Sequence, residues 1–94
     1  MKYRLLLSLD TREEIVDAYE WYERQSVGLG EEFLRALETR LYSIQRNPLM
    51  HPVVHRQIRR SLTRKFPYGI FYHIEGSDVV VLACYHLSRK PKKW

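Results

Sequence analysis

The sequence predicts an α+β fold of the order β-α-α-β-β-β, in which a small, mostly antiparallel sheet packs on a helical hairpin. Two amphipathic stretches, with apolar residues repeated at three and four positions, follow a short apolar run near the start. Three strand-like runs rich in β-branched and aromatic residues fill the second half. With 94 residues the chain is long enough for one core, so we expect a single domain over residues 1–94.

The expected first strand covers residues 3–9 and places its odd-numbered apolar residues on one face. A helix should follow, because Asp10 with Glu13 and Thr11 with Glu14 both have capping-box spacing. The inward stripe of this helix is expected to comprise Ile15, Ala18, Tyr19 and Tyr22. The two glycines of "SVGLG" disfavour its continuation.

The second helix is expected over residues 31–46, with two acidic residues at its start and Arg46 at its end, which suits the helix dipole. Its apolar face comprises Phe33, Leu34, Leu37, Leu41 and Ile44. Asn47 and Pro48 end the helix. Because the break between the two helices is short, we expect them to form an antiparallel pair.

An irregular connector, "PLMHPVVH", leads to three expected strands over residues 56–62, 66–75 and 78–86. Gly76 and Ser77 suit a two-residue hairpin turn between the last two. The register set by this turn pairs Tyr72 with Val81 and Tyr68 with Tyr85 on one face, and Phe71 with Leu82 and His73 with Val80 on the other.

The full chain has a net charge of +5, and its basic residues are concentrated in the second half. Residues 1–47 include seven basic and nine acidic residues, whereas residues 48–94 include nine and two. This distribution predicts an electropositive face for an anionic partner, either nucleic acid or an acidic protein segment. The lone Cys84 and the lack of a membrane-spanning apolar run lead us to expect a cytoplasmic protein.

The sequence lacks the motifs of several enzyme classes. No lysine follows "GLG" as in a phosphate-binding loop, and no serine sits in a nucleophile elbow. His51 and His55 have the spacing of metal ligands, but Pro52 lies between them and no cysteine or carboxylate is close in the sequence. We therefore expect no metal site and no cofactor.

RNA cleavage without a metal remains compatible with the residue types of the second half. It needs a base, a cation beside the phosphate and a proton donor. Arg60, Arg64 or Lys65 could supply the cation, and His86 or Tyr85 the proton. Alternatively, His86 ends a strand and the tyrosines fill the core. Residue types alone leave both interpretations open.

The chain resembles the RelE/ParE superfamily of bacterial toxins, and within it the ParE-like branch. The resemblance rests on the helix pair "AYEWYERQSVGLGEEFLRALETRLYSIQRNP", the strands "RRSLTRKFPYGIFYHIEGSDVVVLACYH" and the ending "HLSRKPKKW". It implies a RelE/ParE-like fold and the toxin role in a type II toxin-antitoxin system. It also implies a cognate antitoxin that wraps and neutralises the toxin, with a homodimer or a heterotetramer with the antitoxin as alternative assemblies.

The resemblance leaves two targets open, because ParE-like toxins inhibit DNA gyrase whereas RelE-like relatives cleave messenger RNA on the ribosome. Lys90 departs from the pattern of ParE-like chains, which often carry an acidic residue before proline. The stretch "PLMHPVVHRQIRR" contains no carboxylate base, which argues against ribosome-dependent cleavage. We therefore expect a gyrase inhibitor that acts by binding. One alternative is a ribosome-dependent messenger RNA endonuclease with Arg64, Tyr85 and His86 as catalytic residues, and another is an inert toxin that acts only in operon autoregulation.

The residues expected to contact gyrase, its DNA or the antitoxin are Arg59, Arg60, Arg64, Lys65, His86, Arg89 and Lys90. We expect these cations to lie along one rim of the sheet. Tyr68, Phe71 and Tyr85 are expected to pack inside the protein.

Overall fold

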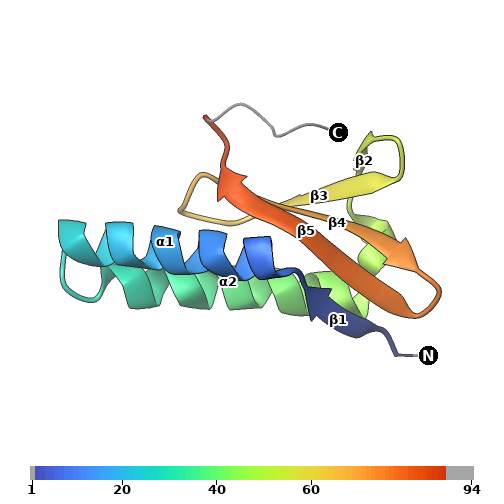
Figure 1. Cartoon of the computed structure of the whole chain (residues 1–94), viewed down its shortest axis with the longest axis horizontal. Coiled ribbons are helices and arrows are strands. Elements are labelled where there is room, and N and C mark those ends of the chain that lie inside the picture. Colours follow the sequence, from blue (N-terminus) through green and yellow to red (C-terminus); the bar gives the residue numbers. More distant parts are fainter. Residues whose placement is uncertain (1, 89–94) are drawn as a thin grey trace.

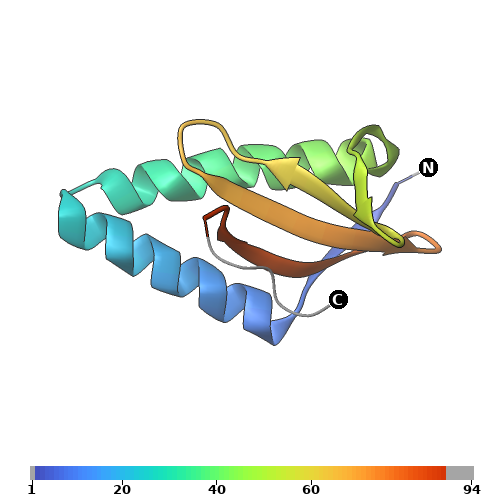
Figure 2. The same cartoon turned by 90° about the horizontal axis from the view of Figure 1, so that it is seen from above.

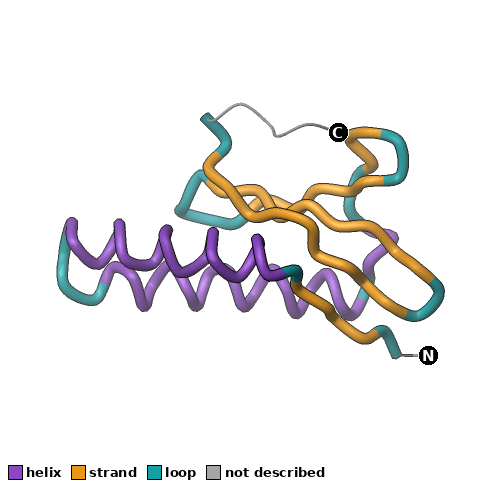
Figure 3. Tube along the Cα trace, in the orientation of Figure 1, coloured by secondary structure: helices purple, strands orange, loops and turns teal. Residues whose placement is uncertain are grey.

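The computed structural model describes residues 2–88, and its two helices and its sheet form two layers (Figures 1 and 3). The elements in chain order are β1 (Arg4–Leu7), α1 (Leu9–Gln25), α2 (Leu29–Arg46), the 3-10 turn η1 (Pro48–Met50), β2 (Val53–His55), β3 (Ile58–Leu62), β4 (Tyr68–Glu75) and β5 (Asp78–His86). The helices are antiparallel, and the strands lie across the pair (Figure 2). The predicted α+β class is confirmed. Neither described helix is both long enough and apolar enough to cross a membrane.

The sheet has five strands in the order β1-β5-β4-β3-β2, one more than predicted. β1 runs parallel to β5, and the other neighbours are antiparallel. The additional strand, β2, lies in the segment predicted as an irregular connector, where Pro52 and the shortness of the strand concealed it. Arg56 and Gln57 form the turn after it, so β3 begins at Ile58 and not at Arg56.

The first helix begins two residues earlier than the predicted capping boxes. Ser8 is its N-cap, because the Ser8 hydroxyl accepts a hydrogen bond of 3.1 Å from the backbone N–H of Thr11. The predicted strand therefore stops at Leu7, and Leu9 opens the helix with an exposed side chain. The capping boxes at Asp10 and Thr11 were thus wrong, and the Glu14 carboxylate accepts instead from the backbone N–H of Cys84 at 2.8 Å.

A carboxylate holds the turn between the two helices. Gly28 lies in the left-handed region with φ 89°, which interrupts the helix, whereas Gly30 is already part of α2. The Glu23 carboxylate accepts hydrogen bonds from the backbone N–H groups of Gly28 and Gly30, at 3.0 and 2.9 Å. A Cβ at Gly30 would lie 2.9 Å from the Tyr19 ring, so this close approach requires glycine. Glu23 therefore caps α2 from the neighbouring helix.

Replacing Glu23 by alanine should lower the free energy of unfolding by about 1–2 kcal/mol, because two N–H groups at the start of α2 lose their acceptor. Urea titration of the purified protein would measure the change. Glu20→Ala, an exposed carboxylate on the same helix, is the matched control and should cost less than about 0.5 kcal/mol. Equal effects of the two substitutions would contradict the capping role.

The main core lies between the helical hairpin and one face of the sheet. Its buried residues include Ala18, Tyr22, Phe33, Leu37, Ile44, Ile70, Tyr72, Val79, Val81 and Cys84. Phe33 contacts the rings of Tyr22, Phe66 and Tyr68, with centroids 5.0–5.5 Å apart. The apolar stripes predicted for both helices thus face the sheet, although Ile15, Tyr19, Leu34 and Leu41 are only half-buried.

A β-bulge in β5 changes the predicted register beyond the hairpin turn. Tyr72 pairs with Val81 and His73 with Val80 as predicted, but the register shifts between Phe71 and Tyr72. The predicted pairs Phe71–Leu82 and Tyr68–Tyr85 are therefore wrong, since Phe71 faces Ala83 and Tyr68 faces His86. The extra residue, Leu82, moves Tyr85 to the face turned away from the helices, where its ring stacks on Phe71 at 4.8 Å.

Candidate interaction surface

The predicted rim of cations does not form as one continuous surface. Arg59 and Arg60 are neighbours on β3, and consecutive side chains of a strand point to opposite faces. Arg59 pairs with Tyr72, which faces the helices, whereas Arg60 pairs with Phe71 on the outer face. The side chains of Arg59 and Arg60 therefore lie on opposite faces of the sheet.

Arg59 stabilises the segment between α2 and β3. Its guanidinium donates to the backbone carbonyls of Leu49 and His51, at 3.2 and 2.6 Å. Nearby, the Tyr72 hydroxyl donates to the carbonyl of Pro48. Burial lowers the pKa of His51, and the charges of Arg40 and Arg59 lower it further. Arg59 therefore has a structural partner already and is not a free contact residue.

Arg59→Ala should lower the free energy of unfolding by about 1–3 kcal/mol, because the carbonyls of Leu49 and His51 would lose a charged donor. Thermal or urea unfolding measures the effect. Arg64→Ala removes the same side chain from an exposed loop and should change stability by less than about 0.5 kcal/mol. A neutral Arg59→Ala would show that this segment does not depend on the guanidinium.

The loop between β3 and β4 carries Arg64 and Lys65 at the surface. The Thr63 hydroxyl donates to the carbonyl of Phe66 at 2.6 Å and anchors the loop from inside. The Lys65 ammonium lies 3.2 Å from a carboxylate oxygen of Glu32 on α2, an exposed pair that contributes little to stability. Arg64 forms no hydrogen bond or ion pair within residues 2–88, so its charge is available to a partner.

Arg60 lies beside a small apolar cluster on the outer face of the sheet. Phe71, Ala83 and Tyr85 are buried there, and Ile58 packs against them. Arg60 is half-buried, and its Nε is buried without a hydrogen-bond partner in the described part of the chain. The cation and the stacked rings together give this face both charge and apolar area.

Tyr85 and His86 do not converge on one site. The Tyr85 ring stacks on Phe71 on the outer face. The His86 ring packs edge-on against Tyr68, which belongs to the main core, at a centroid distance of 5.5 Å. His86 Nδ1 accepts from the backbone N–H of Ser88 at 3.0 Å. Tyr85 and His86 therefore lie on opposite faces of the sheet.

The described residues contain no cluster of three or more His, Cys, Asp and Glu side chains that could hold a metal ion. Burial raises the pKa of Cys84 to about 12, and the nearby Glu14 carboxylate adds to the effect. A thiol with this pKa stays protonated at neutral pH and is not a nucleophile. Cys84 is therefore a core residue. The expected contact residues Arg89 and Lys90 lie outside the described residues.

The helical hairpin carries an apolar groove that the sequence analysis did not predict. The groove has a volume of about 570 Å³ and is lined by Ile15, Val16, Tyr19, Glu20, Glu23, Arg24 and Leu34. Val16 is half exposed, at 53% of its surface, next to the inward stripe. The signal in the sequence was Val16 itself, an apolar residue on a helix face otherwise made of charged residues.

The sequence matches a family model described as the ParE toxin of the type II toxin-antitoxin system parDE, over residues 5–91. The chain belongs to the ParE toxin family. No curated protein matches it in sequence. The matched residues of this ParE-family toxin include the helical hairpin with its groove and all of the sheet except Arg4.

Solved structures share the ParE-family fold at low sequence identity. One is from the chromosomal ParDE toxin-antitoxin system of P. aeruginosa, with a TM-score of 0.82, 10% identity and coverage of 93% of this chain and 98% of that one. Another is from the RelBE2 toxin-antitoxin complex of Mycobacterium tuberculosis, with a TM-score of 0.66, 18% identity and coverage of 92% and 99%. These similarities support the fold and do not distinguish between targets.

Proposed function

We propose that this ParE-family toxin inhibits DNA gyrase by binding and that a cognate antitoxin neutralises it. The observation that carries the proposal is the family match over residues 5–91, since the matched family is that of ParE toxins. Inhibition of gyrase requires a surface that recognises the enzyme or its DNA, and it requires no chemistry in the toxin. Gyrase acts on cytoplasmic DNA, so the proposed function also places the toxin in the cytoplasm.

The arrangement of the candidate catalytic residues argues against the ribonuclease alternative. A general acid and a phosphate-binding cation must lie within hydrogen-bond reach of the same substrate. Tyr85 and His86 lie on opposite faces of the sheet, and His86 packs against the core ring of Tyr68. No Asp or Glu lies between residues 39 and 74, so β2, β3 and the following loop offer no carboxylate base. A role in binding is compatible with all of these positions.

We propose Arg60 and Arg64 as the principal cations of the target surface within residues 2–88. Arg64 is exposed and has no partner in the described structure, and Arg60 lies beside the stacked rings of the outer face. Arg59 and Lys65 have internal partners and contribute less. His86, Arg89 and Lys90 remain proposed contacts at and beyond the end of β5. Such exposed charges mainly raise the rate at which the toxin associates with an anionic partner.

The two solved structures named above are toxin-antitoxin assemblies, and we propose that this chain likewise has an antitoxin partner. The groove between α1 and α2 is the proposed site for an apolar face of that antitoxin. Its apolar lining by Ile15, Val16 and Leu34 would be desolvated by such a partner, which is the main source of free energy in protein association.

A gyrase supercoiling assay with the purified toxin tests the proposed target. The wild-type protein should block supercoiling, and Arg64→Ala should require roughly three to ten times more toxin for the same inhibition. Arg35→Ala, which removes an exposed arginine from α2, is the matched control and should inhibit like the wild type.

Unchanged supercoiling at excess wild-type toxin would reject gyrase as the target. In that case, primer extension on translated messenger RNA separates the alternatives, because specific cuts would indicate an endonuclease. The absence of both activities, together with repression of the operon by the toxin-antitoxin pair, would indicate an autoregulatory role.

A further inference from the structure

The end of the molecule at which α2 terminates is both cationic and apolar. Arg46 ends α2, the Arg59 guanidinium donates to the carbonyls of Leu49 and His51 just after it, and no Asp or Glu occurs from residue 39 to residue 74. This stretch forms the last part of α2, η1, β2, β3 and most of β4. Within it, Leu49, Met50 and Val53 expose 65%, 72% and 49% of their surface. Exposed apolar side chains grouped with unopposed cations are typical of a surface that binds a partner.

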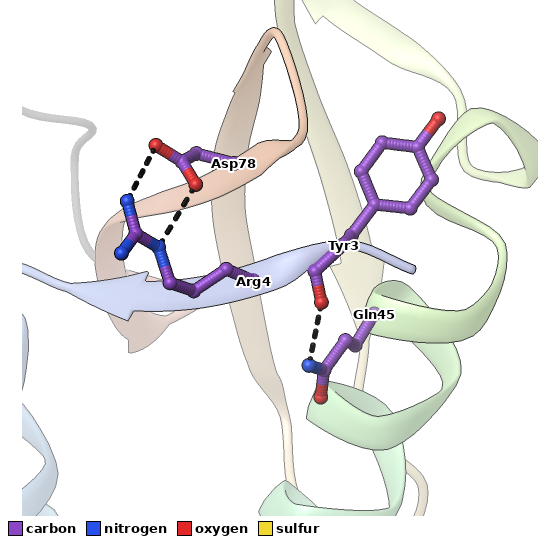
Figure 4. A network of polar contacts seen from close by, with 4 residues as sticks. All are labelled: Tyr3, Arg4, Gln45 and Asp78. Carbon is purple, nitrogen blue, oxygen red and sulfur yellow. Dashed lines mark hydrogen bonds and ion pairs between the residues drawn. The ribbon is translucent and has the colours of Figure 1, made fainter. Parts of the chain in front are cut away.

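A depression of about 510 Å³ lies at this end of the molecule, between the start of β1 and the last turn of α2. It is lined by Lys2, Tyr3, Tyr42, Gln45, Arg46 and Asn47. The Gln45 side-chain amide donates to the backbone carbonyl of Tyr3 at 2.8 Å and fixes the two walls relative to one another (Figure 4). The depression is therefore preformed and large enough for an aromatic or branched side chain.

The lining of this depression combines two tyrosine rings with two cations and includes no carboxylate. Tyr42 exposes 62% of its surface, and the Arg46 guanidinium lies 5.4 Å from the centre of its ring. The nearby Asp78 is already paired with Arg4 at 3.1 Å (Figure 4). The carbonyl groups at the end of α2 carry about half a negative charge, and the two positive charges of Lys2 and Arg46 outweigh it. The depression thus suits an apolar group flanked by anions.

We propose that this end of the molecule is a second docking surface, which binds an acidic segment of a partner protein through an apolar side chain seated between Tyr3 and Tyr42. Carboxylates of that segment pair with Lys2 and Arg46. A protein segment fits better than nucleic acid, because a phosphate backbone would leave Leu49 and Met50 exposed to water. The proposal goes beyond gyrase inhibition, since the surface is distinct from the groove on the helical hairpin and from Arg60 and Arg64.

A nuclear magnetic resonance titration of the full chain tests the proposal with a short synthetic peptide that carries phenylalanine between pairs of glutamates. The peptide should shift the resonances of Tyr3, Tyr42 and Gln45, with a Kd below about 1 mM. Replacing the central phenylalanine by alanine, or the glutamates by lysines, should weaken binding at least tenfold. A single-stranded oligonucleotide of equal charge should bind this surface more weakly than the peptide.

Charge-reversal variants complete the test. Arg46→Glu should weaken peptide binding at least tenfold, whereas Arg35→Glu, an equivalent change on the same helix, should leave it unchanged. Lys2→Glu, which changes no residue of a helix, provides a second variant should Arg46→Glu unfold. Tighter binding of the oligonucleotide, shifts confined to other residues, or equal effects of Arg46→Glu and Arg35→Glu would overturn the proposal. Concentration-dependent self-association that Arg46→Glu abolishes would also overturn it, in favour of a second copy of this chain.

Discussion

Replacing Phe33 by alanine is expected to lower the free energy of unfolding by about 3–5 kcal/mol. The Phe33 side chain is fully buried at the centre of the layer between helices and sheet. Its ring lies 5.3 Å from Tyr22, 5.5 Å from Phe66 and 5.0 Å from Tyr68. Truncation would leave a cavity among three rings that cannot all collapse into it. For a domain of this size, such a loss is a large share of the total stability of about 5–15 kcal/mol.

Tyr42→Ala is the matched control, because it removes an aromatic ring from the same helix at a position with 62% exposure. We expect a loss of less than about 1 kcal/mol, mainly from the contact between Tyr42 and Arg46. Urea unfolding of both variants measures the difference. A loss below about 1 kcal/mol for Phe33→Ala would show that the predicted apolar face of α2 is not the centre of the core.

The second large effect is a loss of stability at alkaline pH. Burial raises the pKa of Tyr72 from 10.0 to about 12, and burial with the nearby Glu14 carboxylate raises the pKa of Cys84 from 9.0 to about 12. The unfolded chain releases both protons at lower pH than the folded protein does. Stability is therefore fully present below pH 9 and falls between pH 9 and 12. At about 1.4 kcal/mol per pKa unit, the rises of about 2 for Tyr72 and about 3 for Cys84 correspond to a loss of stability on the order of 7 kcal/mol by pH 12.

Urea titrations at a series of pH values measure this fall. Cys84→Ala should reduce the slope from pH 9 upward, and Tyr72→Phe should reduce it from pH 10 upward, because each removes one titrating group. At neutral pH, Tyr72→Phe also costs about 1–3 kcal/mol, since the Pro48 carbonyl loses its donor. Tyr42→Phe, at an exposed position, should leave the slope unchanged. A wild-type protein equally stable at pH 8 and pH 11 would contradict the burial of both groups.

Much of the fold follows from local patterns in the sequence. The apolar face of α2 and the bounds of β5 were predicted correctly because each depends on periodicity and on neighbouring turn residues. The start of α1 was not, because Ser8 competes successfully with Asp10 and Thr11 as the cap. The bulge at Leu82 shifts the pairing of β5 with β4, and a regular hairpin register cannot reveal it.

The candidate site was less predictable than the fold. Residue types identified the arginines, but the alternation of side chains along β3 places Arg59 and Arg60 on opposite faces. The Arg59 guanidinium also donates hydrogen bonds to two backbone carbonyls, which residue types do not reveal. The same alternation, displaced by the bulge, separates Tyr85 from His86. The depression between Tyr3 and Tyr42 joins segments far apart in the sequence, so no local pattern indicates it.

The parallel pairing of β1 with β5 has a consequence for synthesis of the toxin in the cell. Arg4 and Asp78 pair across 74 residues, and β5 lies between β1 and β4 in the sheet. In a growing chain that ends before β5, no strand joins β1 to β4. The helical hairpin also lacks the strand against which α1 packs, so part of its apolar face stays exposed. An mRNA truncated before β5 should therefore yield a fragment that proteases remove, so that harmful activity begins only when translation of the last strand is complete.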